Sequence, residues 1–185
     1  MLEQLEQWDR EIFIYLNGLG IEKYDAFWVF VTKIEHWIPW YLFLLGLFFV
    51  VYKRRQAIIG VLLSLGVVAF SLGITEVVKN VVARLRPSNT PEIAELIRVL
   101  QSPTNFSFFS GHASVSLALT TFVVLALRHE LKWIYLIYIW PLLFISSRIY
   151  VGVHFPGDIM VGSLVGVIFG VLFWKWAGRR WIQIS

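Results

Sequence analysis

Apolar residues gather along this chain in five runs, each about as long as a helix that crosses a lipid bilayer. A spanning helix needs about 20 mostly apolar residues, because each residue adds about 1.5 Å toward a hydrocarbon core of about 30 Å. The runs occupy residues 37–52, 57–78, 107–127, 133–147 and 159–176. The pattern predicts an all-α fold: a polytopic membrane helix bundle with five spanning helices.

The first 35 residues follow a different pattern. Apolar and charged residues alternate there at roughly helical spacing, and the charges of Glu22, Lys23 and Asp25 interrupt any span. Such a segment is predicted to lie as an amphipathic helix on the outer membrane interface. The alternative is a sixth spanning helix through residues 12–31, which would bury those three charges in hydrocarbon at a cost.

The simplest division of the chain is into an N-terminal interfacial arm (residues 1–35), a membrane domain (36–178) and a cytoplasmic tail (179–185). Glycines recur in two of the apolar runs, and small residues let neighbouring membrane helices approach closely. They are Gly60, Gly66 and Gly73 in the second run and Gly162, Gly166 and Gly170 in the fifth. Helix packing accounts for them, so we assign them no chemistry.

Composition agrees with a membrane protein and excludes some kinds of chemistry. Hydrophobic residues make up 58% of the chain and aromatic residues 17%. There is no cysteine, so neither a disulfide framework nor a thiolate metal site can form. The net charge of +4 does not indicate a nucleic-acid partner, because the basic residues sit at helix ends and in motifs rather than in one stripe.

Charge also predicts the orientation of the bundle. Lys and Arg gather in three turns on one side, whereas all but one of the twelve acidic residues lie on the other. The basic turns contain Lys53, Arg54, Arg55, Arg128, Lys132, Lys175, Arg179 and Arg180, together with the single acid Glu130. Short loops rich in Lys and Arg stay in the cytoplasm. We therefore expect a multi-pass protein of the inner (plasma) membrane whose other face looks into the periplasm or its equivalent.

Six ionisable side chains at the predicted outer ends of the runs are the hardest to explain by packing. They are Lys79, Arg86, His112, Arg148, His154 and Asp158. A single Lys or Arg there could simply snorkel to the interface, but three cations repel one another unless they enclose an anion. Because Arg and Lys both bind phosphate well, Lys79, Arg86 and Arg148 are predicted to clamp one. Arg84, two residues from Arg86, is expected to point away toward solvent or lipid headgroups.

Two short motifs add polar groups where helices are expected to begin. Ser110 and Gly111 precede a long apolar run, so Ser110 fits an N-cap and the amides that follow fit an anion site. Pro156 suits a first helical turn, which leaves His154 just before the helix and Asp158 inside that turn. An Asp bonded to one imidazole nitrogen leaves the other free to attack phosphorus. Helix capping alone would also explain each motif.

Taken together, these motifs resemble the three signature motifs of the type 2 phosphatidic acid phosphatase superfamily. The first is Lys79-Asn-Val-Val-Ala-Arg-Leu-Arg86-Pro87, the second is Ser110-Gly111-His112, and the third runs from Ser147-Arg148 through His154 to Asp158. The spacings also agree, with six residues between Lys79 and Arg86, five between Arg148 and His154, and three between His154 and Asp158. Three motifs in the right order are far more specific than any one of them.

The resemblance implies a role for each motif residue. His154 would form a phosphohistidine, Asp158 would orient it, and His112 would protonate the leaving oxygen. The phosphoryl oxygens would be held by Lys79, Arg86, Ser110, Gly111 and Arg148. No cofactor is implied, and no Asp or Glu cluster suited to Mg²⁺ lies near the motifs, so the predicted chemistry is metal-independent. The family commonly has Pro before Ser-Gly-His where this chain has Phe109, a change that bears on loop geometry or headgroup preference more than on activity.

An enzyme of this kind would act on a lipid phosphate or pyrophosphate. Undecaprenyl pyrophosphate is the leading substrate, and phosphatidylglycerol phosphate, phosphatidic acid and the 1-phosphate of lipid A are the alternatives that similar family members handle. The outer loop at residues 88–108 is expected to select the headgroup, and the N-terminal arm is a second candidate for this role. A non-enzymatic lipid-phosphate transporter could use the same cations but would need no nucleophile. The apolar runs argue against a soluble haloperoxidase, and no oligomeric state is predicted.

Overall fold

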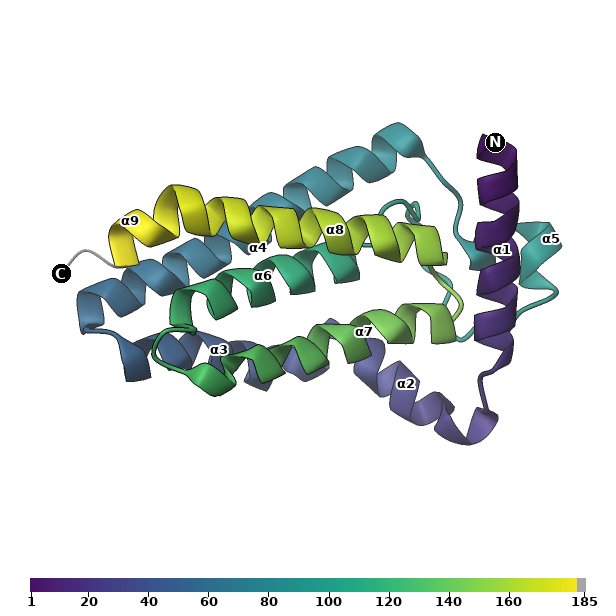
Figure 1. Cartoon of the computed structure of the whole chain (residues 1–185). Helices are drawn as coiled ribbons and strands as arrows, with labels where there is room; N and C mark the ends of the chain where they lie inside the picture. The colour runs from purple at the N-terminus through teal and green to yellow at the C-terminus, as the bar shows by residue number, and fades with distance from the viewer. Residues whose placement is uncertain (183–185) are drawn as a thin grey trace.

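The computed structural model describes residues 1–182, and the side chains of all of these except Leu2, Trp181 and Ile182. Within that range the regular structure is helical, with no strand. Long helices run side by side, and helix α1 lies across one end of them (Figure 1). The predicted all-α membrane bundle is therefore confirmed.

Five helical segments of the described chain coincide with the five apolar runs. Four are long and apolar enough to cross a membrane, at Ile34–Val51, Arg54–Ala94, Lys132–Tyr150 and Pro156–Gly178, and the shorter apolar helix α6 (Gly111–Leu127) is the fifth. The chain is a multi-pass membrane protein.

The regular α-helices within these segments are α3 (Ile38–Val51), α4 (Arg54–Val82), α7 (Ile139–Tyr150) and α8 (Pro156–Phe173). Helix α3 is preceded by a 3₁₀ helix at Ile34–Trp37 and α7 by one at Lys132–Tyr138. Helix α8 continues through a π-helix at Trp174–Gly178 into the short α9 (Arg179–Ile182).

Helix α6 is the centre of the bundle. Its residues beyond the first turn are almost all buried, and α8 and α4 are the helices that contact it most. Helix α8 comes close through its glycines: a β-carbon added at Gly162, Gly166 or Gly170 would lie 2.7, 2.3 or 2.7 Å from a backbone oxygen of α6 or its N-cap. The packing role predicted for this series is confirmed.

The glycine series in α4 fits the prediction only in part. A β-carbon at Gly60 would lie 2.3 Å from the ring of Phe48, so this glycine does allow a close approach. At Gly66 the nearest atom would be at 3.6 Å, and at Gly73 nothing lies within 4 Å. Packing therefore explains Gly60 and does not explain Gly73.

The N-terminal arm folds into two helices rather than one span. Helix α1 (Leu2–Gly18) ends before a 3₁₀ turn at Glu22–Tyr24, and α2 (Asp25–Thr32) follows. The alternative of a helix that crosses the membrane through residues 12–31 is therefore wrong. The division into an arm and a membrane domain at residue 35 stays a prediction.

The arm is fastened to the end of the bundle. The side-chain amide of Asn17 donates to the backbone oxygens of Arg98, Ile149 and Tyr150 at distances of 3.0 to 3.1 Å. Arg98 also pairs with Asp25 at 2.6 Å, and this guanidinium lowers the pKa of the Asp25 carboxyl. The arm thus contacts both the loop after α4 and the end of α7.

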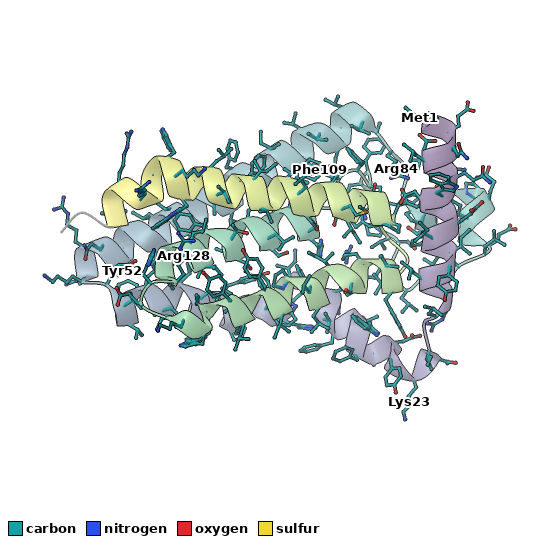
Figure 2. The ribbon with its side chains drawn as sticks, in the orientation of Figure 1. Met1, Lys23, Tyr52, Arg84, Phe109 and Arg128 are labelled. Atoms are coloured by element: carbon teal, nitrogen blue, oxygen red, sulfur yellow. The ribbon has the colours of Figure 1, made fainter. Side chains whose placement is uncertain are left out.

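The two ends of the bundle differ in charge. The three basic turns lie together at the end away from α1, which Figure 2 marks with the labels Tyr52 and Arg128. The Tyr52 hydroxyl donates to the Ala126 oxygen at 2.6 Å, so the ends of α3 and α6, which lead into two of these turns, are in contact. The opposite end holds α1, a 3₁₀ helix at Pro87–Asn89, α5 (Pro91–Ala94) and the start of α8 (Figure 1). Which end faces the cytoplasm stays a prediction.

Candidate active site

His154 and Asp158 meet where α8 begins. His154 lies just before the N-cap residue Phe155 and is 1% exposed. Pro156 opens the helix, so Asp158 falls in the first turn, where its Oδ2 accepts a hydrogen bond from the Phe155 amide at 3.0 Å. The same oxygen lies 3.4 Å from His154 Nδ1. The predicted helix start and the contact between the two side chains are confirmed.

Ser107 joins this pair and was not predicted. Its hydroxyl donates to Asp158 Oδ2 and lies 3.2 Å from His154 Nδ1. Ser107 is fully buried, and its amide donates to the backbone oxygen of Arg84 at 2.8 Å, which fixes the loop. The residue stands in a phenylalanine-rich loop ahead of Ser110, where its spacing carries no signal.

Arg86 covers the other edge of the imidazole. Its Nη1 lies 3.1 Å from His154 Nε2 and donates to the Val153 oxygen at 2.9 Å. Its Nε and Nη2 donate to the backbone and side-chain oxygens of Asn105, both at 2.8 Å. Burial, followed by the positive charge of Arg86, holds the pKa of His154 well below its usual range. The imidazole is therefore neutral at pH 7, and the carboxylate of Asp158 favours the tautomer with its proton on Nδ1.

Arg148 and His112 meet at Thr32, a residue of α2 that the sequence did not single out. Arg148 Nη1 donates to Thr32 Oγ1 and, at 3.3 Å, to Gln101 Oε1. His112 Nε2 lies 3.3 Å from the Thr32 backbone oxygen. Arg148 is 4% exposed, and within the described residues its Nε has no hydrogen-bond partner. A buried donor of this kind is costly to leave unpaired, so it is suited to a ligand.

Lys79, Ser110 and Gly111 complete the predicted set. Lys79, in the last turn of α4, is 7% exposed and lines the end of a cavity together with Gly111. Ser110 Oγ accepts from the Ala113 amide at 3.4 Å, which confirms the predicted N-cap. The Ser110 amide donates to the backbone oxygen of Asp158 at 3.0 Å and so ties the start of α6 to the start of α8.

The predicted cations do gather around His154. The positive charges of Arg86, Arg148, Lys79 and Arg84 all oppose its protonation and help to lower its pKa. With the contacts described above, the structure brings all eight predicted site residues to one end of the bundle.

Arg84 contradicts the prediction that it points toward solvent or lipid headgroups. Its Nη1 donates to Asp158 Oδ1 at 2.7 Å, and its Nη2 donates to Asp9 Oδ2 at 2.7 Å. The guanidinium also lies 4.1 Å from the centre of the Phe155 ring. Figure 2 shows Arg84 on the side of the bundle that faces α1, the helix that carries Asp9.

The backbone explains this difference. The chain leaves α4 through Ala83, which adopts the left-handed conformation with φ 50°, and is not helical from there to Arg86. Arg84 and Arg86 then bind different atoms of one pair: Arg86 lies at the imidazole of His154, and Arg84 lies at the far oxygen of Asp158. The inference that the two arginines diverge was correct, but the target assigned to Arg84 was wrong.

A cavity of about 460 Å³ leads away from the site between α3, α4, α6 and α7. Lys79, Asn105 and His112 line its polar end, and most of its other lining residues are apolar, as far as Leu65 on α4 and Leu119 on α6. From Lys79 to Leu65, α4 covers about 21 Å at about 1.5 Å per residue. The cavity therefore has a polar end at the site and a long apolar part.

Fold and site together define a class of protein: a multi-pass membrane helix bundle with a buried histidine and carboxylate at one end, faced by arginines and a lysine. The model of the PAP2 superfamily matches residues 60–182. The chain therefore belongs to the PAP2 superfamily, the type 2 phosphatidic acid phosphatase family that its motifs resemble.

Known relatives cover most of the chain. A lipid A 4'-phosphatase of Bacteroides thetaiotaomicron is 30% identical over 94% of this chain and 79% of its own. An undecaprenyl-diphosphatase of Sulfolobus acidocaldarius is 36% identical over 84% of this chain and 72% of its own. Among solved structures, a PAP2-type phosphatidylglycerolphosphate phosphatase from Bacillus subtilis superposes with a TM-score of 0.72 over 95% of this chain and 87% of its own, at 21% identity. The relatives support a phosphatase and are named for different lipids.

Proposed function

We propose that this chain is a membrane lipid phosphatase in which His154 attacks phosphorus and carries the phosphoryl group as a phosphohistidine. The setting of His154 carries the proposal: it is a neutral, buried imidazole whose Nδ1 lies near Asp158 and Ser107 and whose Nε2 lies near Arg86. A carboxylate that orients one nitrogen leaves the lone pair of the other available to attack.

The reaction is a double displacement. The lone pair of His154 Nε2 forms a bond to phosphorus while the bond from phosphorus to the leaving oxygen breaks, and His112, which enters this step protonated, gives that oxygen its proton. A water molecule then attacks the phosphohistidine and passes a proton to His112, the phosphorus–nitrogen bond breaks, and inorganic phosphate leaves. Asp158 stabilises the positive charge that the imidazole carries between the two steps.

The phosphoryl oxygens bind on the side of the site that holds unused donors. Arg148 offers its buried Nε, and Lys79 offers an ammonium group at the polar end of the cavity. Ser110 and Gly111 contribute the start of α6, where amides and the helix dipole favour an anion. Arg86 transfers its hydrogen bond from His154 Nε2 to a phosphoryl oxygen as the substrate binds. Phosphoryl transfer needs mainly such positioning and charge stabilisation.

The substrate we favour is undecaprenyl pyrophosphate. The long apolar part of the cavity suits a lipid tail whose phosphate lies at Lys79 and His112. A relative 36% identical to this chain is named an undecaprenyl-diphosphatase, which supports the choice. Phosphatidylglycerol phosphate, phosphatidic acid and lipid A phosphates are the other candidates, and a lipid A 4'-phosphatase is also among the relatives.

We further propose that the protein lies in the inner (plasma) membrane with this site on the outer face, because the basic turns at the opposite end favour the cytoplasm. The reaction is proposed to need no metal. Within the described residues no group of three or more His, Asp or Glu side chains is placed to hold a metal ion. Activity is expected to survive EDTA, and loss restored by Mg²⁺ would contradict this part of the proposal.

A panel of lipid phosphates and pyrophosphates, assayed by phosphate release from the purified protein, tests the function and ranks the substrates. The wild type should release phosphate, and His154→Ala should release none above background. Acid-labile phosphate should be trapped on the wild type but not on His154→Ala. Near-normal release by His154→Ala would overturn the nucleophile, and binding without release by the wild type across the panel would favour a carrier.

A further inference from the structure

Asp158 is bound on both carboxylate oxygens, and only one of them faces His154. Oδ2 accepts from the Ser107 hydroxyl and the Phe155 amide and lies 3.4 Å from His154 Nδ1. Oδ1 accepts from Arg84 Nη1 at 2.7 Å. Asp158 is fully buried, and burying a carboxylate is costly unless it is paired and hydrogen-bonded. Arg84 supplies the opposite charge.

Asp9 holds Arg84 from the opposite side. Arg84 Nη2 donates to Asp9 Oδ2 at 2.7 Å, and Asp9 Oδ1 accepts from the Gly157 amide at 2.7 Å. A β-carbon at Gly157 would lie 2.9 Å from Asp9 Oδ2, so a glycine there lets the carboxylate reach the first turn of α8. The two ends of the guanidinium fork are thus fixed by a carboxylate of α8 and a carboxylate of α1.

We infer that Arg84 and Asp9 are positioning residues that act through Asp158 on His154. Helix α1, which carries Asp9, therefore contributes to the active site. The inference rests on the function proposed above. Within the described residues, Arg84 is the partner that holds Oδ1 of Asp158 away from the imidazole. Without it the buried carboxylate turns toward the remaining cations, and His154 loses the contact that keeps its attacking nitrogen in place.

A purely structural role for these pairs makes a different prediction. If they only fasten α1 to the bundle, their loss lowers the unfolding temperature and leaves the turnover of the folded enzyme unchanged. The experiment therefore has to record kcat, KM and thermal stability for the same full-length variants in detergent.

Arg84→Gln and Asp9→Asn are the informative substitutions, and Glu3→Gln is the matched control, because Glu3 is an exposed carboxylate of the same helix. We expect kcat to fall about 10- to 100-fold in Arg84→Gln, the loss typical when the hydrogen-bonded partner that orients a metal-ligating side chain is removed. In Asp9→Asn kcat should fall less. In both variants KM should stay within about twofold of the wild-type value, and Glu3→Gln should match the wild type. Arg84→Lys, which keeps the charge without the fork, should lie between Arg84→Gln and the wild type.

The dependence on Asp158 is the decisive measurement. In an Asp158→Asn background, Arg84→Gln should change kcat by less than about twofold, because both residues act along one path. The inference would be overturned if Arg84→Gln lowered kcat in that background as much as it does in the wild type. It would also be overturned if Arg84→Gln alone left kcat unchanged and only lowered the unfolding temperature. His154→Ala, assayed in parallel, separates the two hypotheses. If it stays active, the proposed function fails, and if it is inactive while Arg84→Gln keeps wild-type kcat, only this inference fails.

Discussion

The two sides of the candidate active site are built differently. On the nucleophile side, formed by His154, Asp158 and Ser107, both imidazole nitrogens and both carboxylate oxygens have partners. On the phosphate side, formed by Lys79, His112 and Arg148, the buried Nε of Arg148 has none within the described residues. The cavity of about 460 Å³ also opens on that side.

This difference indicates which groups the protein holds in place before the substrate binds and which donors it leaves unpaired for the ligand. A nucleophile held by its neighbours does not need to reorganise during the reaction, which lowers the barrier. Donors without partners are instead satisfied by the ligand when it arrives. Substitutions on the nucleophile side should therefore act on kcat, and substitutions on the phosphate side should also act on the binding of anions.

Asp158→Asn removes the carboxylate of the nucleophile side and should cause the largest loss of kcat. The neutral amide does not pair with the charge of Arg84, and it no longer favours the Nδ1 proton of His154. We expect kcat to fall about 10²- to 10⁴-fold with KM within about threefold, measured by phosphate release from the purified protein. A kcat within about tenfold of the wild type would mean that the carboxylate does not orient His154.

Arg148→Gln tests the phosphate side. Removing one charged donor from a phosphoryl site should lower kcat/KM about 10²- to 10³-fold. It should also raise the Ki of inorganic phosphate at least about tenfold, since a charge-assisted hydrogen bond is lost. Asp158→Asn should leave that Ki nearly unchanged. If both variants weakened phosphate binding equally, the division into two sides would be wrong.

Gly166→Ala tests the contact between α6 and α8, which joins the two sides. The added β-carbon would lie 2.3 Å from the Ser114 backbone oxygen, so one helix has to move. We expect the free energy of unfolding to fall by about 1 to 3 kcal/mol, measured by thermal unfolding in detergent. Gly73→Ala is the control, because nothing lies within 4 Å of its added carbon, and it should be neutral or stabilising by up to about 1 kcal/mol. Equal unfolding temperatures would contradict the packing described for α8.

The pH dependence of stability should be the smallest effect. It tests whether His154 is as buried on the nucleophile side as the structure shows. Since burial holds the pKa of His154 well below its usual value of about 6.5, the unfolded chain takes up a proton below that pH and the folded chain does not. Stability is therefore lost as the pH falls below about 6.5, by up to about 1.4 kcal/mol per pH unit.

The comparison of wild type with His154→Asn isolates this contribution. Between pH 7 and pH 5 the unfolding temperature of the wild type should fall more steeply than that of the variant, by about 3 to 6 °C per pH unit. Parallel slopes would mean that His154 takes up its proton in the folded protein as readily as in the unfolded chain.

Much of the fold was predictable because it follows local rules. The apolar runs mark the five helical segments of the bundle, since length and hydropathy decide what crosses a bilayer. The starts of α6 and α8 follow from Ser110 and Pro156, because capping and proline chemistry depend on neighbouring residues. The side chains of His154 and Asp158 meet for the same reason, since they lie within one turn of each other.

The rest of the site depends on contacts between distant parts of the chain. Ser107 lies 51 residues from Asp158 in sequence, Thr32 lies 116 residues from Arg148, and Asp9 lies 148 residues from Gly157. No periodicity or spacing links such positions. A serine, a threonine and an aspartate are also common in loops and amphipathic helices, so their roles become visible only when the helices are packed.

The short length of α6 determines how deep in the bundle its first residues lie. With 17 residues, α6 covers about 25 Å, less than a hydrocarbon core of about 30 Å, and its start is set back from the ends of α7 and α8 (Figure 1). Gly111 and His112, which line the polar end of the cavity at this start, therefore lie deeper in the bundle than the ends of α7 and α8. A lipid phosphate has to enter between those helix ends to reach His112, so we expect the rate of turnover to depend on how well the bilayer thickness matches the bundle.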